Sequence, residues 1–444
     1  MFNNLALNKY FYLFLFLIAG GLACGQQSVM PLTATEKKQV IGTIIQKMTD
    51  IYIYPERGRK MNDALSALEK KGTYDQITDP AVFAAKLRED LVAVSHDRHL
   101  NITFDPDWVQ ASKKTLSKQD SLELIHKDFP NARADNFGFK EVRILDGNIG
   151  YLNLTKFYDP ALGGETAAAA MNFLNNTDAL IIDLRHNGGG YGDMVQLVAS
   201  YLYSTEQVLI LDLYSREEDR HKQDWTLPYV PGKRMPDKPV YVLTGPETFS
   251  AAESFTYFLK NQKRATVIGE KTGGGAHPVH HQVLNGRFTI FIPYGRPIDP
   301  ITKTDWENTG VIPDLAVPAK DALLTAQVRA LDSLLATQPA NANAAWALAP
   351  LKAAQHPIVI PPAVLRSYAG SYSGGVRKLL LEDGKLYFQR SGQSKYTLQP
   401  LAIDLFRVTE IPYLRIKISK QGDKVTGFIR LYQDGSSFTE NRDN

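Results

Sequence analysis

From residue 148 onward the chain alternates between short apolar runs and helical segments, and this alternation limits the folds open to it. Apolar runs bounded by turn residues predict strands, and the segments between them have apolar residues at helical spacing. Strands that alternate with helices form a sheet covered by helices, much of it parallel. We expect strands at 150–154, 179–184, 239–243 and 265–269, with helices at 165–174, 193–202, 251–259 and 321–335.

Segments with other sequence patterns flank this α/β core. Residues 33–96 have apolar residues at spacings of three and four, which predicts an N-terminal helical module. Residues 99–104 alternate as a strand does, and this strand is expected to carry His99 on its polar face. After residue 363, Asp-Gly and Gly-Asp turns between short alternating runs are typical of a small barrel or sandwich. The predicted organisation is a signal peptide (1–25), a helical module (30–98), an α/β core (99–337), a linker (338–362) rich in Ala, Asn and Pro, and an all-β accessory domain (363–444).

Composition excludes several classes of protein. The formal net charge of +3 gives no reason to expect nucleic acid or an anionic membrane as partner. The single cysteine, Cys24, excludes a disulfide framework and a zinc-ribbon site.

The N-terminus predicts export from the cytoplasm. Lys9 precedes an apolar run from Phe11 to Ala23 that is typical of a secretory signal peptide and too short to span a bilayer. Signal peptidase would cleave before Gln26. Alternatively, the sequence up to Cys24 resembles a bacterial lipobox, in which that cysteine becomes the lipidated first residue, or the cysteine simply ends the apolar run. We expect a bacterial protein of the periplasm, or one held at the membrane only through a lipid anchor at Cys24.

Two segments at predicted strand ends carry groups suited to acyl transfer. The glycines at 188–190 follow a buried strand and open a helix, so their backbone N–H groups can bind an anionic oxygen. The lysine of a P-loop and the spaced glycines of a dinucleotide site are missing. Ser250 begins a helix, where the helix dipole stabilises negative charge. Taken alone, Ser250 and Glu253 are better explained as a capping box, and a plain turn is the alternative explanation for the glycines.

With three further motifs, these segments resemble the serine peptidase family that includes the tail-specific (C-terminal processing) proteases, the tricorn core protease and interphotoreceptor retinoid-binding protein. The resemblance covers roughly residues 35 to 336 and implies a ClpP/crotonase-like α/β peptidase core. The motifs are Asp97-Arg98-His99, the Asp-Leu-Arg-x-Asn-x-Gly-Gly stretch at 183–190, Ser250-Ala251-Ala252-Glu253, Gly269-Glu270-Lys271-Thr272 and the segment 307–314.

The family has two catalytic arrangements, and Gly275 separates them. Members that pair serine with lysine have the catalytic lysine at the position of Gly275, whereas Lys271 matches a non-catalytic lysine. The tricorn-like branch uses a histidine and a distant glutamate. The resemblance therefore implies Ser250 as nucleophile, His99 as general base, Glu307 as the group that orients it, and an oxyanion hole made by the backbone N–H groups of Gly189, Gly190 and Ala251.

Other residues near these motifs receive structural roles. Arg98 replaces the relay serine of the tricorn-like pattern, and we expect it to pair with Asp97 or with the substrate. Asp183 and Arg185 are expected to hold the glycine turn. Histidines within 277–281 are expected to border the cleft rather than to bind metal, and the mechanism implies no metal and no cofactor.

The sequence thus predicts an exported serine peptidase that acts on a peptide or protein. Residues 105–147 are too few for the PDZ module that tail-specific proteases often carry. We therefore expect the core cleft or the β-domain to recognise the substrate. Two alternatives stay open: a non-catalytic protein that binds hydrophobic ligands on the same fold, and an esterase or amidase of the cell envelope. The oligomeric state is not indicated.

Overall fold

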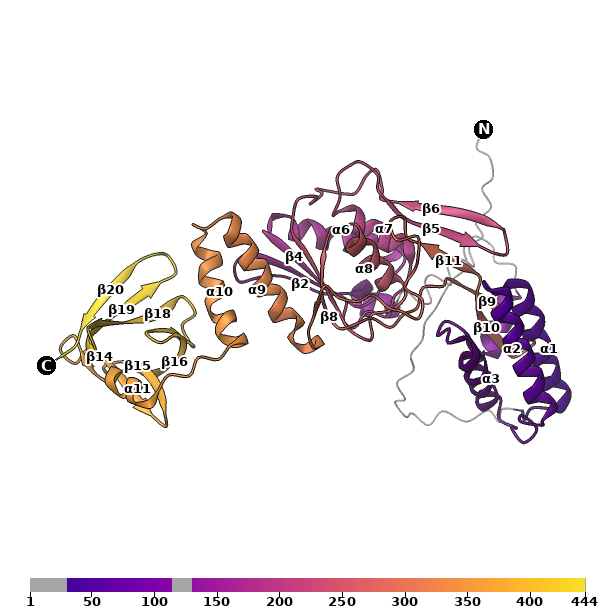
Figure 1. The fold of residues 1–444 in the computed structure, drawn as a ribbon, viewed down its shortest axis with the longest axis horizontal. Coiled ribbons are helices and arrows are strands. Elements are labelled where there is room, and N and C mark those ends of the chain that lie inside the picture. Colours follow the sequence, from indigo (N-terminus) through magenta and orange to yellow (C-terminus); the bar gives the residue numbers. More distant parts are fainter. Residues whose placement is uncertain (1–29, 114–129, 444) are drawn as a thin grey trace. The chain divides into compact units, whose positions relative to one another are not determined.

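The computed structural model describes residues 30–113 and 130–443 (Figure 1). Its contacts divide the chain into two compact units. Unit 1 comprises residues up to 142 together with 152–175 and 182–319, and unit 2 comprises 143–151, 176–181 and 320 onward. The predicted signal peptide and Cys24 lie outside the described residues. Within the described ranges, the helices are all too short or too polar to cross a membrane.

The N-terminal module of unit 1 is helical, as the apolar spacing predicts. It consists of α1 (Ala34–Ile51), α2 (Pro55–Lys70) and α3 (Pro80–Ser95), which lie side by side in Figure 1. The Thr33 hydroxyl accepts a hydrogen bond from the Glu36 N–H and caps α1, and the Asp79 carboxylate caps α3. The buried helix faces share one apolar core with the strand residues Phe288 and Ile290.

A three-stranded antiparallel sheet beside these helices brings two distant segments to one edge. Its order is β1 (Asn101–Phe104), β10 (Phe288–Pro293) and β9 (Val279–Val283), with the short helix α4 (Pro106–Ser112) after β1. Asn101 lies opposite Phe291, which lies opposite His281. Because β1 and β9 both run antiparallel to β10, they run parallel to each other. The residues that lead into them, 97–99 and 277, therefore lie at the same end of the sheet.

The central sheet is covered by helices and is parallel at one side, as predicted. Its order is β12 (Leu315–Ala316), β8 (Thr266–Gly269), β7 (Val240–Thr244), β4 (Ala179–Asp183), β3 (Ile149–Leu154) and β2 (Phe139–Leu145), and β12, β8 and β7 are parallel. The helices α6 (Pro160–Phe173), α7 (Gly192–Ser200) and α8 (Ala251–Asn261) connect its strands (Figure 1). The Leu184 N–H donates to the Leu243 carbonyl, so β4 and β7 end together. The segments that follow these two strands meet at this edge of the sheet.

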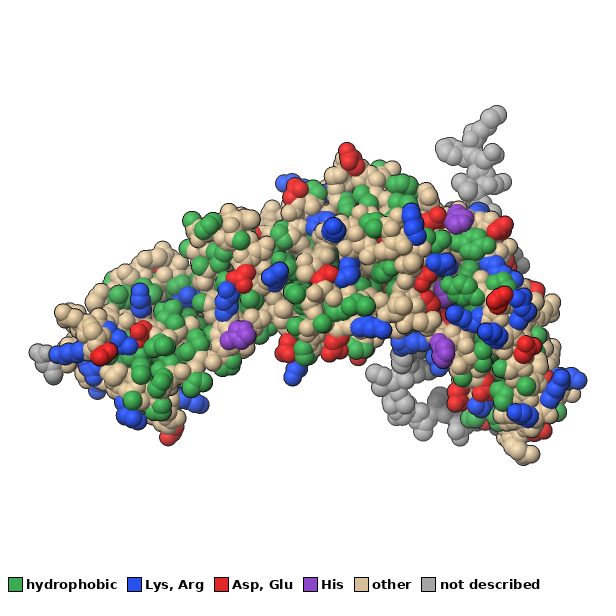
Figure 2. All heavy atoms as spheres, viewed as in Figure 1, with side chains coloured by type: hydrophobic (Ala, Val, Ile, Leu, Met, Phe, Trp, Pro, Cys, Tyr) green, Lys and Arg blue, Asp and Glu red, His purple; other side chains and the backbone are tan. Residues whose placement is uncertain are grey.

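Several elements were not predicted from the sequence. A second small sheet has the order β11 (Gly295–Ile298), β5 (Leu209–Ser215) and β6 (Arg220–Trp225), and β6 is largely exposed. Two short 3₁₀ turns, η1 (Asn136–Gly138) and η2 (Leu174–Asn176), complete the core. Figure 2 shows acidic and basic side chains mixed over the visible face, as expected from their near balance in the sequence.

Unit 2 corrects the predicted linker. Within 338–362 the chain forms the helix α10 (Ala342–Gln355), which follows α9 (Ala319–Thr337) and precedes α11 (Pro362–Tyr368). The segment therefore has regular structure, and its alanines supply the buried positions Ala344, Ala347 and Ala353. A high alanine content removes the contrast between apolar and polar faces on which periodicity depends.

The all-β domain is an eight-stranded antiparallel meander. Hydrogen bonds between 371–373 and 441–443 join its first and last strands, so the sheet closes into a barrel. Predicted turns at 383–384, 422–423 and 434–435 each connect a hairpin. The strands are β13 (Gly370–Tyr372), β14 (Arg377–Glu382), β15 (Lys385–Arg390), β16 (Lys395–Ala402), β17 (Leu405–Val408), β18 (Leu414–Gln421), β19 (Lys424–Tyr432) and β20 (Ser437–Asn441).

Candidate active site

Ser250 occupies a strained turn between β7 and α8. Its backbone has φ 54° and ψ −119°, a conformation that costs a non-glycine residue on the order of 1–3 kcal/mol. Its N–H donates to the Glu253 carboxylate at 2.9 Å, which is one half of the capping box considered above. The same strand–turn–helix geometry places the nucleophile of other serine hydrolases at a sheet edge.

Glu253 fastens this turn to the loop after β8. Its fully buried carboxylate also accepts from the Thr272 hydroxyl at 2.5 Å and from the N–H groups of Gly274 at 2.7 Å and Gly275 at 2.9 Å. Burial raises the pKa of Glu253, and the four hydrogen bonds offset part of that rise. The carboxylate is thus saturated with donors and acts as a structural link.

The glycine turn after β4 lies against Ser250. Arg185 donates to Asp183 from Nε at 2.9 Å and from Nη2 at 2.6 Å, which holds the turn as expected. A Cβ built on Gly189 would lie 2.7 Å from the Ser250 Cβ and 3.1 Å from the Ala251 nitrogen. Only glycine permits this approach, and Gly189 also has a positive φ of 105°.

One proposed oxyanion donor is already occupied. The Gly189 N–H donates to the Asn187 Oδ1 at 2.8 Å, and the same asparagine donates from Nδ2 to the Leu154 carbonyl at 2.9 Å. The Gly189 amide is therefore not available to an oxyanion in this arrangement. The predicted donors at Gly190 and Ala251 are left for that role.

His99 is buried, and the prediction that it lies on the polar face of a strand is wrong. The strand starts only at Asn101, and the His99 side chain precedes it with 4% of the residue exposed. Neither ring nitrogen has a hydrogen-bond partner among the described residues. Burial lowers the pKa of His99 to about 4. The imidazole is therefore neutral at pH 7, the state that a general base requires.

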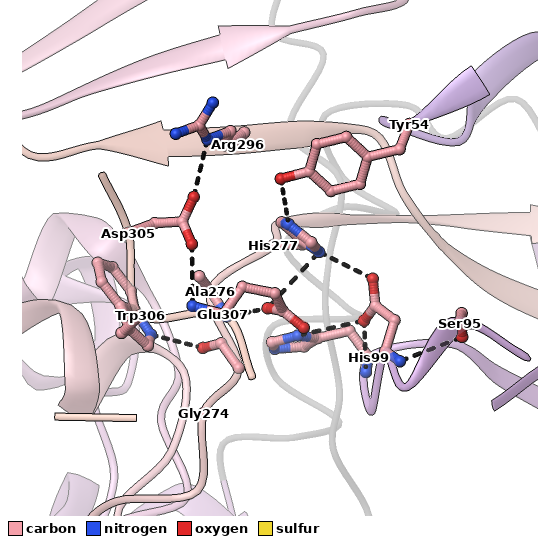
Figure 3. Close-up of polar contacts among 12 residues, drawn as sticks. Tyr54, Ser95, His99, Gly274, Ala276, His277, Arg296, Asp305, Trp306 and Glu307 are labelled. Atoms are coloured by element: carbon pink, nitrogen blue, oxygen red, sulfur yellow. Dashed lines mark hydrogen bonds and ion pairs between the residues drawn. The ribbon is translucent and has the colours of Figure 1, made fainter. Parts of the chain in front are cut away.

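A chain of buried polar groups surrounds this histidine (Figure 3). The Asp97 Oδ1 accepts from the His99 N–H at 3.1 Å, and its Oδ2 lies 2.8 Å from Nδ1 of His277. The same His277 nitrogen lies 3.5 Å from Oε2 of Glu307, whose Oε2 also accepts from the Ala276 N–H at 2.6 Å. Oε1 of Glu307 is buried without a partner in the described structure.

Contacts among Asp97, His277 and Glu307 determine which of these side chains are charged. Burial by itself would raise the pKa of Asp97 and lower that of His277, but their hydrogen bond and attraction reverse both directions. The Asp97–His277 pair is therefore ionic. Burial raises the pKa of Glu307 to about 7, with the negative charge of Asp97 adding to the rise and His277 opposing it. Glu307 is thus poised to change charge near neutral pH.

His277 is the residue that sequence reasoning missed. The prediction put it at the border of the cleft, whereas the parallel course of β1 and β9 places it level with Asp97. The spacing of both residues ahead of their strands is visible in the sequence, but the pairing of β1 and β9 with a common strand is not.

Arg98 does not pair with Asp97, so that alternative is wrong, and pairing with the substrate stays a prediction. Its Nη1 donates to the Gly273 carbonyl at 3.0 Å, and its guanidinium lies 4.9 Å from the centre of the Phe249 ring. The Asp97 carboxylate is occupied by His277 and by the Tyr52 hydroxyl at 3.2 Å. Arg98 therefore braces the loop beside the nucleophile.

Phe249 and Gly275 bring the nucleophile turn and the histidine together. Phe249 precedes Ser250, and its ring centre lies 4.8 Å from that of His99. A Cβ built on Gly275 would lie 2.2 Å from the Phe249 Cζ and 2.6 Å from the His99 Cε1. The space beside residue 275, where lysine-dependent relatives carry their base, is filled by these two rings.

One group of side chains in the described structure has the composition of a metal site. Asp97, His99 and Glu307 each offer one ligand atom, and these atoms lie within 4.8 Å of one another. His281 is not part of it, because its Nε2 bonds to the Thr289 hydroxyl at 2.9 Å and its ring stacks between Trp108 and Phe291. All three residues belong to the network of buried polar groups around His99 described above.

Comparison with known proteins identifies the family of the chain. Residues 148–317 match the model of peptidase family S41, and residues 27–133 match the model of the N-terminal domain of peptidase S41 in eukaryotic IRBP. These matches confirm the family expected from the motifs.

Individual relatives are distant. The chain is 30% identical over 172 residues to the chloroplastic carboxyl-terminal-processing peptidase 2 of Arabidopsis thaliana, covering 38% of this chain and 32% of that protein. It is 30% identical over 129 residues to a carboxyl-terminal-processing protease of Synechocystis, covering 29% and 28%. A putative peptidase of Parabacteroides merdae has a similar structure at 20% identity and TM-score 0.44, covering 64% of this chain and 90% of that one. The chain spans about a third or less of the length of the first two relatives.

Replacing Gly275 by alanine tests the packing beside His99. The added methyl would overlap the Phe249 and His99 rings, and overpacking of this kind costs about 1–3 kcal/mol. We expect Gly275→Ala to lower the unfolding free energy by that amount in urea titrations. Gly286→Ala is the matched control, because a Cβ there meets nothing within 4 Å. Equal stability of the two variants would contradict the packing described.

Replacing Glu307 by glutamine tests its raised pKa. Between its ordinary value of 4.5 and about 7, folded Glu307 keeps a proton that the unfolded chain releases, so the wild-type unfolding free energy falls as pH rises through this window. Glutamine does not titrate, and its carbonyl still accepts from Ala276. We expect Glu307→Gln to gain stability relative to wild type from pH 5 to pH 8, by up to about 1.4 kcal/mol per pH unit.

The control for this titration is Glu56→Gln, because Glu56 is on the surface in a weak pair with Arg59. Urea unfolding at both pH values should show no pH-dependent difference for that control. A pH-independent difference for Glu307→Gln would show that the carboxyl is not proton-linked near pH 7.

Proposed function

Residues 148–317 of this chain belong to peptidase family S41, and from that premise we propose that the protein is a serine peptidase that uses Ser250, His99 and Glu307. The observation that supports the proposal is that Phe249 lies next to two features. A serine in a strained turn lies on one side of it. A buried neutral histidine, with no other hydrogen-bond partner among the described residues, lies on the other.

The reaction begins with proton transfer from Ser250 to His99. As the Ser250 oxygen attacks the scissile carbonyl, a neutral His99 accepts the hydroxyl proton and later returns it to the leaving amine. Water then hydrolyses the acyl-enzyme by the same steps.

Glu307 stabilises the imidazolium that forms on His99. Its buried, unpartnered Oε1 is suited to accept a hydrogen bond from the ring, and ionisation near pH 7 supplies the balancing charge. Asp97 positions His99 through the backbone N–H, and His277 holds Asp97 and Glu307 together. His277 and Asp97 are thus positioning residues.

The oxyanion of the tetrahedral intermediate would be bound by backbone amides. We assign this role to the N–H groups of Ala251 and Gly190, because the Gly189 amide is engaged by Asn187. Each such donor contributes about 3–4 kcal/mol to transition-state stabilisation in serine hydrolases. A histidine mechanism also fits residue 275, since a lysine there would overlap both rings.

The substrate class and location follow from the relatives and from the N-terminus. Relatives named for carboxyl-terminal processing act on proteins, which supports a peptide or protein substrate here. Residues 1–25 support export, to the periplasm or to a membrane through lipid on Cys24.

An activated serine can be detected by labelling the purified mature protein with a fluorophosphonate probe. We expect labelling of wild type, none of Ser250→Ala, and at least about 100-fold slower labelling of His99→Ala, as expected for loss of the general base. The labelling rate should rise through about pH 7, where Glu307 ionises. EDTA should leave it unchanged, because no step requires a metal.

Controls separate chemistry from folding and from the alternatives. His186→Ala is the matched histidine control, since His186 is exposed and forms a surface contact with Glu247. Absence of labelling in folded wild type would contradict the enzyme proposal and favour a ligand-binding protein. Labelling accompanied by hydrolysis of small esters, but of no peptide in a library, would favour the esterase alternative.

Lipidation is tested in the expressing bacterium. We expect wild type in the membrane fraction and incorporation of labelled palmitate that Cys24→Ala abolishes. A soluble wild type whose mature chain begins at Gln26 would instead show ordinary signal-peptidase cleavage.

A further inference from the structure

Unit 2 contains a cavity of about 370 Å³ away from the residues used above. Its walls are the segment 144–148, the helix α10, the barrel strands β17 and β18, the loop after β17, and Gln433 after β19. Its volume is at the lower end of the range for small-molecule sites. The cavity thus has the size for a ligand of one or two amino-acid residues.

Two arginines stand side by side in its wall. Arg407 on β17 lies directly opposite Arg415 on β18, and both line the cavity. Like charges in directly opposite positions of a sheet are destabilising. Arg415 is also only 8% exposed. This arrangement therefore costs stability unless an anion compensates it.

The described part of the chain supplies no acidic partner for either arginine. Neither arginine forms an ion pair with any acidic side chain in the described part of the chain, and the acidic residue in the lining, Asp146, is exposed and unpaired with them. Arg407 donates from Nε to the Gln399 amide oxygen at 2.7 Å. Burial, with Arg407 adding to the effect, lowers the pKa of Arg415 to about 10. The wall carries two positive charges against one exposed negative charge.

Contacts hold both guanidinium groups, and their remaining N–H groups have no hydrogen-bond partner among the described residues. The Arg415 guanidinium lies 3.8 Å from the centre of the Trp346 ring, and its Nη2 donates to the Trp346 carbonyl. The Trp346 indole in turn donates to the Pro412 carbonyl at 3.2 Å. A held guanidinium loses little side-chain entropy on binding, so the geometry is prepared for a planar acceptor.

We propose that this arginine pocket, formed by Arg407, Arg415 and Trp346, binds the carboxylate of a ligand whose apolar part packs on the neighbouring wall. A guanidinium binds a carboxylate through two parallel hydrogen bonds. The excess of one positive charge matches a monoanion better than a phosphate dianion. Ala347, Val408 and Pro350 provide the apolar surface beside the charges. The carboxylate comes either from the C-terminal residue of a peptide or from a free carboxylic acid.

The test uses the full mature chain with Ser250→Ala, so that no probe is hydrolysed. The probes are N-acetyl-leucine, an acetylated tetrapeptide ending in leucine, the C-terminal amides of both, and inorganic phosphate. Calorimetry and thermal unfolding should show that each acid binds at least tenfold more tightly than its amide. Tighter binding of the tetrapeptide acid than of N-acetyl-leucine identifies a peptide C-terminus as the source, and equal binding identifies a free acid.

Variants locate the site. Arg415→Lys keeps the charge but loses the paired donors, and it should weaken acid binding at least tenfold. Arg407→Gln removes the like-charge pair, so it should raise the unfolding temperature of the free protein while abolishing its rise with ligand. Arg390→Gln, at an exposed arginine of β15, should match wild type in both respects. Because Arg407→Gln is expected to be more stable, the test does not depend on Arg415→Lys folding.

Several results would overturn the proposal. Equal binding of acids and amides, or no binding of either acid, would remove the carboxylate from recognition. Undiminished binding in Arg407→Gln would place the ligand elsewhere. Phosphate binding as tight as that of the acids would show a site for another class of anion.

Discussion

The candidate active site depends on one buried carboxylate. Glu253 accepts four hydrogen bonds, from the nucleophile turn and from the loop at 272–275, and these segments are otherwise far apart in the chain. A buried charge is tolerated only when its lone pairs are satisfied, so each donor is fixed in position. The positive φ of Ser250 and the position of Gly275 beside His99 both follow from this link.

A second group of buried polar side chains differs from Glu253, because some of its hydrogen-bonding atoms have no partner among the described residues. Asp97 and His277 satisfy each other, but Oε1 of Glu307 and both ring nitrogens of His99 have no partner among the described residues. Unsatisfied buried polar atoms are costly in a folded protein. The His99 ring packs on Phe249, the residue before the strained Ser250, and unsatisfied groups near such a serine are suited to catalysis. The contrast with the saturated Glu253 separates the structural carboxylate from the proposed catalytic one.

The same contrast appears at the arginine pocket of unit 2. There the unsatisfied groups are two guanidiniums placed opposite each other by the register of β17 and β18. In both places the sheet or barrel fixes the backbone. The unsatisfied side chains then lower the stability of the protein, and a bound substrate or ligand would offset that loss. Recognition and chemistry are thus assigned to separate parts of the chain.

Much of this protein was determined by its sequence. Helical spacing before residue 96, strand and helix alternation after 148 and turn dipeptides after 363 report local preferences, so they predicted the elements and the fold class. The family resemblance, rather than any local preference, implied that the glycine and serine motifs at strand ends belong to one site. The alanine-rich stretch at 342–355 was misread because alanine gives no contrast between helix faces.

Only the tertiary structure determined which side chains and backbone groups contact one another at these two sites. The burial of His99, the pairing of Asp97 with His277 and the engagement of the Gly189 amide by Asn187 all depend on which strands pair and in what register. The opposition of Arg407 and Arg415 depends on it as well. Pairing is set by long-range packing of whole elements, and a one-residue shift would exchange every partner. Local sequence carries residue type and spacing, but it does not carry that register.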